Sequence, residues 1–148
     1  MVLAGLLCMF LLGMGFQAFG QANPNVPSWF MELPPADVEW GIGYGKLTNI
    51  PNSMNYAEFN ARMDLARKVF FQVRAFMIDY SRMSNQFDEF EYEVFAEELS
   101  FEFGNDVRIV RRSVESDGSN WCRVEINRAG FAKYCDLGLK MIQKYSYQ

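Results

Sequence analysis

The chain has 148 residues, a formal net charge of −4 and no histidine. This length predicts a single domain. The lack of histidine excludes catalytic dyads and triads built on imidazole, and zinc sites with histidine ligands. The net negative charge argues against a nucleic-acid-binding protein, which usually carries a basic face.

The first sixteen residues form an unbroken apolar run, and the first charged side chain is Glu32. The run is shorter than the about 20 residues that a spanning helix needs, and it has the length of the apolar centre of a secretory signal peptide. Small residues near its end predict cleavage after Gly20 or after Ala22. We therefore expect residues 1–20 to be a signal peptide and the protein to be exported, with an uncleaved N-terminal anchor as the alternative.

Residues 21–36 are predicted to form an extended arm, because their four prolines fix φ and remove backbone donors. Two large aromatic side chains, Trp29 and Phe30, lie within this arm. Aromatic residues in such a segment usually tie it onto the core, and we expect that arrangement here. An exposed docking motif is the alternative.

The segment 37–47 is predicted to be a strand, since its apolar residues occur at every second position. They are Val38, Trp40, Ile42 and Tyr44. The opposite face carries three glycines, Gly41, Gly43 and Gly45. Glycine weakens a strand, so this arrangement predicts the close approach of a helix across that face. Trp40 and Tyr44 are candidates for an interaction or ligand surface.

Apolar residues at spacings of three and four predict a long helix from Asn55 to about Met83. The sequence Asn55-Tyr-Ala-Glu58 resembles a capping box at its start. After it, residues 84–106 contain eight acidic and no basic side chains. We expect a helix to about Leu99 followed by an extended tail. Its acids are expected to form a solvated face, because the calcium-binding loop pattern is absent.

Two strands over 107–115 and 121–127 are predicted to form a hairpin around the turn Ser116-Asp-Gly-Ser-Asn120. Five arginines make this hairpin basic: Arg108, Arg111, Arg112, Arg123 and Arg128. The three in the first strand, Arg108, Arg111 and Arg112, are candidates for an interaction surface. We expect internal charge pairing or a solvated face, and specific recognition of an anion is the alternative.

Asn127 is predicted to cap a last helix that runs to about Tyr145. Cys122 on the strand and Cys135 on this helix would both face the layer between them. A disulfide is typical of an even cysteine count in an exported chain, and two buried free thiols are the alternative. The third cysteine, Cys8, follows Leu7, where a lipid-attachment site needs a small residue, so lipidation is not expected.

The sequence predicts no catalytic residue, no metal site and no cofactor. Neither a Cys-x-x-Cys redox pair nor an imidazole is present. The acidic residues are plentiful, but no spacing marks two of them as the carboxylate pair of a hydrolase.

The order of motifs resembles the LPP20 family of bacterial envelope proteins, the twenty-kilodalton lipoproteins, and the related N-terminal domain of the flagellar assembly protein FlgT. The residues that carry the resemblance are Pro27-Ser-Trp29-Phe30, Trp40-Gly-Ile-Gly-Tyr-Gly45, Ala61-Arg62-x-x-Leu65-Ala66-Arg67 and Val107-Arg-Ile-Val-Arg-Arg. The resemblance implies a small α+β, dodecin-like domain in which a long helix crosses an antiparallel sheet. It also implies a periplasmic or outer-membrane setting, and it supplies no catalytic residues.

Together these observations predict an α+β domain over residues 37–148, with about three antiparallel strands, a long helix across them and a C-terminal helix. We expect a non-enzymatic interaction or assembly module whose partners are envelope proteins or a second copy of the chain itself. Peripheral association with a membrane is compatible with this role. A periplasmic small-ligand carrier that uses aromatic surfaces is the first alternative, and a carboxylate hydrolase is the second.

Overall fold

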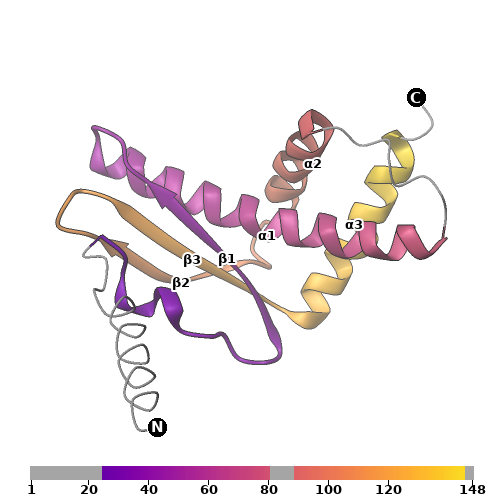
Figure 1. Ribbon diagram of the computed structural model, residues 1–148, viewed down its shortest axis with the longest axis horizontal. Coiled ribbons are helices and arrows are strands. Elements are labelled where there is room, and N and C mark those ends of the chain that lie inside the picture. Colours follow the sequence, from indigo (N-terminus) through magenta and orange to yellow (C-terminus); the bar gives the residue numbers. More distant parts are fainter. Residues whose placement is uncertain (1–24, 81–88, 146–148) are drawn as a thin grey trace, which may run out of the picture.

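A computed structural model of the chain describes residues 25–80 and 89–145. A 3-10 turn, η1 (Ser28–Met31), precedes strand β1 (Val38–Gly45) and the long helix α1 (Ile50–Tyr80). Helix α2 (Glu89–Glu102), the hairpin strands β2 (Arg108–Val114) and β3 (Asn120–Asn127), and helix α3 (Arg128–Tyr145) follow. The strands form one antiparallel sheet in the order β1-β3-β2 (Figure 1). The predicted α+β fold is therefore confirmed.

The glycines of β1 let the backbone of α1 lie directly against the sheet. A Cβ atom built on Gly43 would stand 1.9 Å from the carbonyl oxygen of Ala57, and one on Gly41 would stand 2.1 Å from that of Ala61. Neither distance is possible for a real side chain, so only glycine allows this packing. The close approach of a helix, predicted from the spacing of the glycines, is confirmed.

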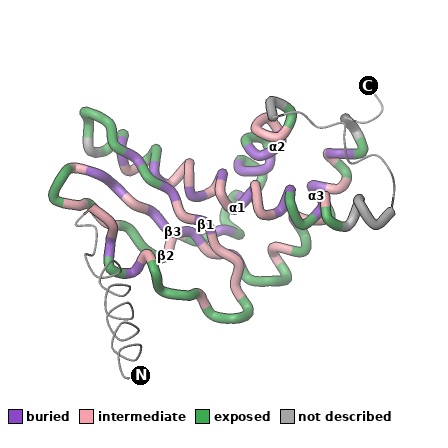
Figure 2. The backbone as a smooth tube through the Cα atoms, viewed as in Figure 1, coloured by how far each residue is buried: buried purple, intermediate pink, exposed green. Residues whose placement is uncertain are grey.

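The core lies between the face of the sheet that α1 covers and the three helices (Figure 2). The central strand β3 contributes Cys122, Val124 and Ile126, all nearly or fully buried. The helices contribute the largest buried side chains: Leu65, Val69, Phe70, Phe95, Leu99 and Ile142. Gly138 of α3 lies so close to Phe95 that an added Cβ would be 3.0 Å from that ring. The three helices are thus packed on one another as well as on the sheet.

Helix α1 begins at Ile50, five residues before the predicted start at Asn55. The capping-box sequence therefore lies inside the helix and does not begin it. Pro51 occupies the first turn, where its missing N–H has no intrahelical partner to lose. Residues 46–49 form the loop between β1 and this helix.

Helix α2 continues through Glu102, beyond the predicted end at Leu99. The alternation of Leu99, Phe101 and Phe103 does not form an extended tail. Leu99 faces the core, Phe101 is 69% exposed, and Phe103 is buried just past the end of the helix. A turn follows at Gly104, whose φ of 47° is a conformation that glycine adopts readily.

The expected disulfide is not formed, and both Cys122 and Cys135 are free thiols. Cys122 is paired with Gly43 of β1 inside the sheet, whereas Cys135 lies in α3, which begins only after β3 has ended. A disulfide requires Cα atoms within about 7 Å. Helix α3 continues beyond the end of β3 and does not fold back across the sheet (Figure 1).

Asn127 caps α3 as predicted, since its side-chain oxygen accepts a hydrogen bond from the amide of Gly130 at 2.7 Å. The predicted signal peptide and Cys8 lie outside the described residues. Within residues 25–80 and 89–145, no helix has both the length and the apolar character that crossing a bilayer requires.

Candidate functional site

The arm packs on the face of the sheet opposite α1. Trp29 is 9% exposed, and the ring of Phe30 meets Trp121 of β3 edge to face at 5.3 Å between centroids. The guanidinium of Arg123 donates a hydrogen bond to the carbonyl oxygen of Glu32 at 2.8 Å. The structure therefore places the two aromatic residues of the arm in contact with the domain, and η1 forms a helical turn in the described part of this segment.

The aromatic residues of β1 are also in contact with other side chains. The ammonium nitrogen of Lys68 lies 4.0 Å from the centroid of the Trp40 ring, where a cation–π interaction is favourable. Tyr44 meets Trp121 edge to face at 5.0 Å between ring centroids and is 41% exposed. The predicted ligand surface is thus divided between two clusters: Trp40 lies beside Lys68, and Phe30 and Tyr44 lie around Trp121.

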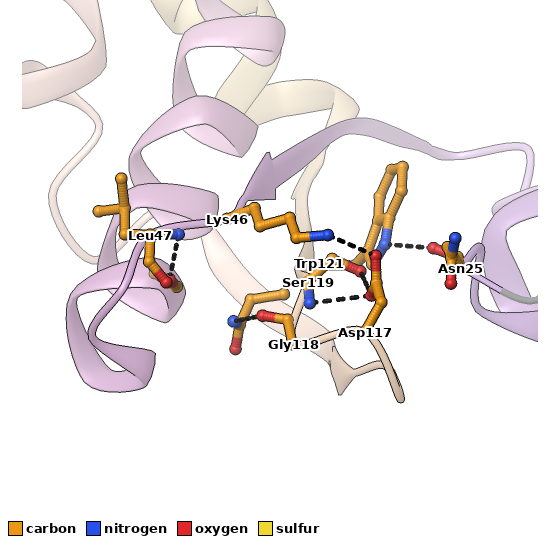
Figure 3. A network of polar contacts seen from close by, with 9 residues as sticks. Asn25, Lys46, Leu47, Asp117, Gly118, Ser119 and Trp121 are labelled. Atoms are coloured by element: carbon orange, nitrogen blue, oxygen red, sulfur yellow. Dashed lines mark hydrogen bonds and ion pairs between the residues drawn. The ribbon is translucent and has the colours of Figure 1, made fainter.

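A polar network at one end of the sheet joins the arm, β1 and the hairpin (Figure 3). The carboxylate of Asp117 accepts hydrogen bonds from Lys46 at 2.9 Å and from the amide of Ser119 at 3.0 Å. These bonds, that from Lys46 first, hold the pKa of Asp117 well below its ordinary value. Nearby, the indole N–H of Trp121 donates to the carbonyl oxygen of Asn25 at 2.9 Å. The turn of the hairpin is therefore held in place from both sides.

The outer edge of β1 is closed by side chains of α1. Three polar residues at every fourth position of the helix reach the unpaired backbone groups of the strand. Asn60 donates to the carbonyl oxygen of Tyr44 at 2.7 Å, Asp64 accepts from the amide of Ile42 at 3.0 Å, and Lys68 donates to the carbonyl oxygen of Trp40 at 2.5 Å. An edge strand with satisfied backbone groups is a poor template for another strand.

Asn60, Asp64 and Lys68 were not identified from the sequence. Each directly precedes a fully buried residue: Ala61, Leu65 or Val69. A polar row that borders the apolar stripe at this spacing, on the helix that meets the glycine strand, is the pattern from which the closed edge could have been predicted.

The outer edge of β2 is open in the part of the chain that the structure describes. β2 pairs with β3 on one side, and no hydrogen bond to its backbone comes from any other described segment. Arg108, Arg111, Arg112 and Val114 are exposed along it. The sheet therefore has one edge contacted by helix side chains and one edge whose outward backbone groups have no partner within residues 25–80 and 89–145.

A β-bulge between Ile109 and Arg111 decides which arginine of β2 lies on which face of the sheet. Arg108 and Arg111 pair with Glu125 and Arg123 on the face that the arm covers. Without the extra residue, regular alternation would have turned Arg111 toward α1.

The predicted internal charge pairing involves two of the three arginines. Arg111 lies 3.7 Å from the carboxylate of Glu32 in the arm, and Arg112 lies 2.9 Å from that of Glu58 in α1. Arg108 has no ion-pair partner among the described residues. The acidic helix α2 supplies none of these carboxylates.

A pocket of about 310 Å³ lies between the arm and the sheet. It is lined by Glu32, Leu33, Pro35, Val110, Arg111, Arg123 and Glu125. Its two carboxylates are each paired with an arginine, Glu32 with Arg111 at 3.7 Å and Glu125 with Arg123 at 3.0 Å. The catalytic acid of a glycosidase instead sits in an apolar surrounding that keeps it protonated.

A second pocket, of about 270 Å³, lies between α1 and α2 and is lined by Asn55, Glu58, Phe59, Arg62, Ser100 and Phe101. Groups of three or more side chains able to hold a metal ion do not occur within residues 25–80 and 89–145. Burial raises the pKa of Cys122 and of Cys135 to about 11, so that both thiols are protonated at neutral pH.

No family model and no curated protein matches the chain. Among solved structures, the chain is similar to the secreted protein HP1454 from the human pathogen Helicobacter pylori, with 24% sequence identity and a TM-score of 0.36. The matched region covers 74% of this chain and 37% of that protein. A TM-score of this size does not place two chains in one fold, so the functional argument depends on the residues of this chain.

Proposed function

We propose that the protein is an exported, non-enzymatic interaction module of the bacterial cell envelope, and that the open edge of β2 is the surface that meets its partner. The observation that carries this proposal is the difference between the two edges of the sheet. The side chains of α1 occupy the edge of β1, while the edge of β2 has exposed side chains and a backbone without a second partner in the described chain. Adding a strand to such an edge is a common mode of protein recognition.

The export and envelope parts of the proposal rest on the sequence. The apolar run of the first sixteen residues, followed by small residues, is typical of a secretory signal peptide. The motifs of the arm, the glycine strand and the long helix resemble the LPP20 family, and membership of that family is part of what we propose. Its setting in the periplasm or at the outer membrane follows from the same resemblance.

Two features of the described residues support a role without catalysis. The thiols of Cys122 and Cys135 have a raised pKa of about 11, which leaves little nucleophilic thiolate. The carboxylates that share a pocket, Glu32 and Glu125, are paired with arginines. The reactivity of these thiols and carboxylates therefore supports a role in binding a partner more than a role in catalysis.

Site-specific photo-crosslinking in cells tests the proposal. A photoreactive residue would replace Val114, which is 53% exposed on β2, and, as a matched control, Phe71, which is 58% exposed on α1. We expect the Val114 position to crosslink to one segment of one envelope protein, identified by mass spectrometry of the digested product, and the Phe71 position not to. Equal products from both positions, or none from Val114, would contradict the proposal.

A periplasmic small-ligand carrier is the second candidate, and the pocket beside the arm is the observation that favours it. The guanidinium of Arg123 is almost fully buried there, and its Nε atom has no hydrogen-bond partner. A carrier would show a higher melting temperature with a bound small molecule, and Arg123→Lys would abolish that shift. A melting temperature unmoved by a broad screen of periplasmic metabolites would remove this candidate.

A further inference from the structure

We infer that the occupant of the β2 edge is an extended acidic segment of a partner protein. This inference rests on the proposed function, because it names the chemistry of the partner at the same edge. It depends on the charges carried by β2, on the faces to which the bulge directs them, and on the weakness of the internal pairs that hold them.

The strand β2 is basic within an acidic chain. Its sequence, Arg108-Ile-Val-Arg-Arg-Ser-Val114, has three arginines and no acidic residue, while the whole chain has a formal charge of −4. A strand added at this edge would place its side chains directly beside those of β2, where opposite charges stabilise the pairing and like charges oppose it. Charge complementarity therefore favours a segment rich in Asp and Glu.

The positions of the three arginines give the expected segment a particular pattern. Arg108 and Arg111 lie on the face toward the arm, and Arg112 lies on the face toward α1. An added strand alternates its side chains between the same two faces. To meet all three arginines, the partner segment needs acidic residues on both of its faces, which differs from the one-sided alternation of an ordinary edge strand.

The internal ion pairs leave these arginines available. The pair between Arg111 and Glu32 is long, at 3.7 Å, and both side chains are more than half exposed. Arg112 is 52% exposed beside Glu58, and Arg108 has no ion pair in the described chain. Exposed pairs of this kind contribute little to stability, so a carboxylate from a partner can replace or join them at small cost.

The same charges disfavour a second copy of the chain as the occupant. If β2 paired with itself in an antiparallel arrangement along its full length, Arg111 would stand opposite Arg111 of the other copy. Like charges directly opposite each other destabilise a strand pair. The arginines thus disfavour self-association and favour an acidic strand at the same time, which is how specificity is often built into an interface.

Peptide binding to the processed protein, purified from cells that express the full chain, tests the inference. The probe is a blocked seven-residue peptide, Val-Glu-Val-Glu-Glu-Val-Glu, and its matched control has Lys in place of every Glu. We expect the acidic peptide to slow hydrogen exchange of the β2 amides, and to lose affinity as salt is raised. The lysine peptide is expected to protect no amide of β2.

Two variants connect the binding to charge. Arg108→Gln, which breaks no ion pair in the described chain, is expected to lower the affinity for the acidic peptide by about fivefold to tenfold. Lys140→Gln removes the same charge from an exposed position of α3 and is expected to change the affinity by less than about twofold. Unchanged melting temperatures would show that both variants are folded.

Several outcomes would overturn the inference. Equal protection by the lysine peptide would show that charge does not select the occupant, and protection confined to α1 and α2 would move the site to the pocket beside Phe101. A dimer whose interface protects β2 would assign the edge to a second copy.

If crosslinking from Val114 persists while the acidic peptide does not bind, the inferred occupant is wrong and the proposed function stands. If the peptide binds while Val114 gives no crosslink, the chemistry of the edge stands and the proposed envelope function fails.

Discussion

The carboxylate of Asp64 in α1 accepts a hydrogen bond from the backbone amide of Ile42 at 3.0 Å, and a helix side chain thereby takes a place that a neighbouring strand would fill. Asn60 and Lys68 act on the same edge, one helical turn before and one after. The two edges of the sheet thus differ in a way that the strand order alone does not reveal, and this difference is the basis on which we propose β2 as the partner-binding edge.

Replacing Asp64 should reopen the closed edge. Asp64→Ala removes the acceptor of the Ile42 amide, and we expect the free energy of unfolding to fall by about 1 kcal/mol, together with an increase in self-association. Urea unfolding and size-exclusion chromatography measure the two effects. Gln72→Ala, at an exposed position of the same helix, is the control and should change neither. An Asp64→Ala protein as stable and as monomeric as the parent would show that this contact does not close the edge.

Adding one methyl group to Gly43 should destabilise the fold strongly. The new Cβ would be placed 1.9 Å from the carbonyl oxygen of Ala57, which is part of the helix backbone and cannot turn away. We expect Gly43→Ala to cost at least about 3 kcal/mol of stability, by forcing α1 off the sheet.

Gly118→Ala separates this steric effect from a general effect of replacing glycine. Gly118 has a φ of 81° and no atom within 4 Å of an added Cβ, so only backbone strain of about 1 kcal/mol is expected. Chemical denaturation of both variants measures the difference, and equal losses would contradict the close approach of the helix.

The stability of the hairpin end should depend on pH through Asp117. Its pKa is lowered by the hydrogen bonds from Lys46 and Ser119. A carboxylate with a lowered pKa in the folded state contributes stability that is present above its ordinary value and is lost as the pH falls toward the lowered one. At pH values below about 4, we expect the melting temperature to decrease. The variant Asp117→Asn is expected to have a lower melting temperature at neutral pH and a weaker dependence on acid. Asp136→Asn, on the exposed surface of α3, should leave the profile unchanged.

The two cysteines should behave as protected thiols. Because burial raises the pKa of Cys122 and Cys135 to about 11, we expect slow alkylation by iodoacetamide at neutral pH in the native protein. In denaturant without a reductant, both should be labelled rapidly, which intact mass spectrometry detects as one added group per cysteine. A requirement for reductant would instead reveal a disulfide.

The sequence predicted the parts of the fold that depend on local patterns. The glycines at 41, 43 and 45 predicted the contact with a helix, because glycine weakens a strand and three glycines on one face therefore indicate a close neighbour. Asn127 predicted the start of α3 because a cap acts within one turn.

Features that depend on distant segments could not be predicted in the same way. The sequence indicates the face on which Cys122 and Cys135 lie, but not that α3 leaves the sheet and packs on α1 and α2. The bulge beside Ile109 is defined by the pairing of β2 with β3, so the face on which Arg111 lies could not be predicted from the sequence of β2. The basic strand was therefore recognised as a candidate surface, while its role as the open edge required the structure.

The order of the strands has a consequence for how the chain is completed. The central strand, β3, is the last of the three in the sequence, and both β1 and β2 depend on it for their backbone pairing. Until residues 120–127 have been made, β1 has only α1 against it, and the sheet does not exist. This arrangement suits the export that we propose, in which a chain passes a channel unfolded, because the fold closes only when the last strand arrives.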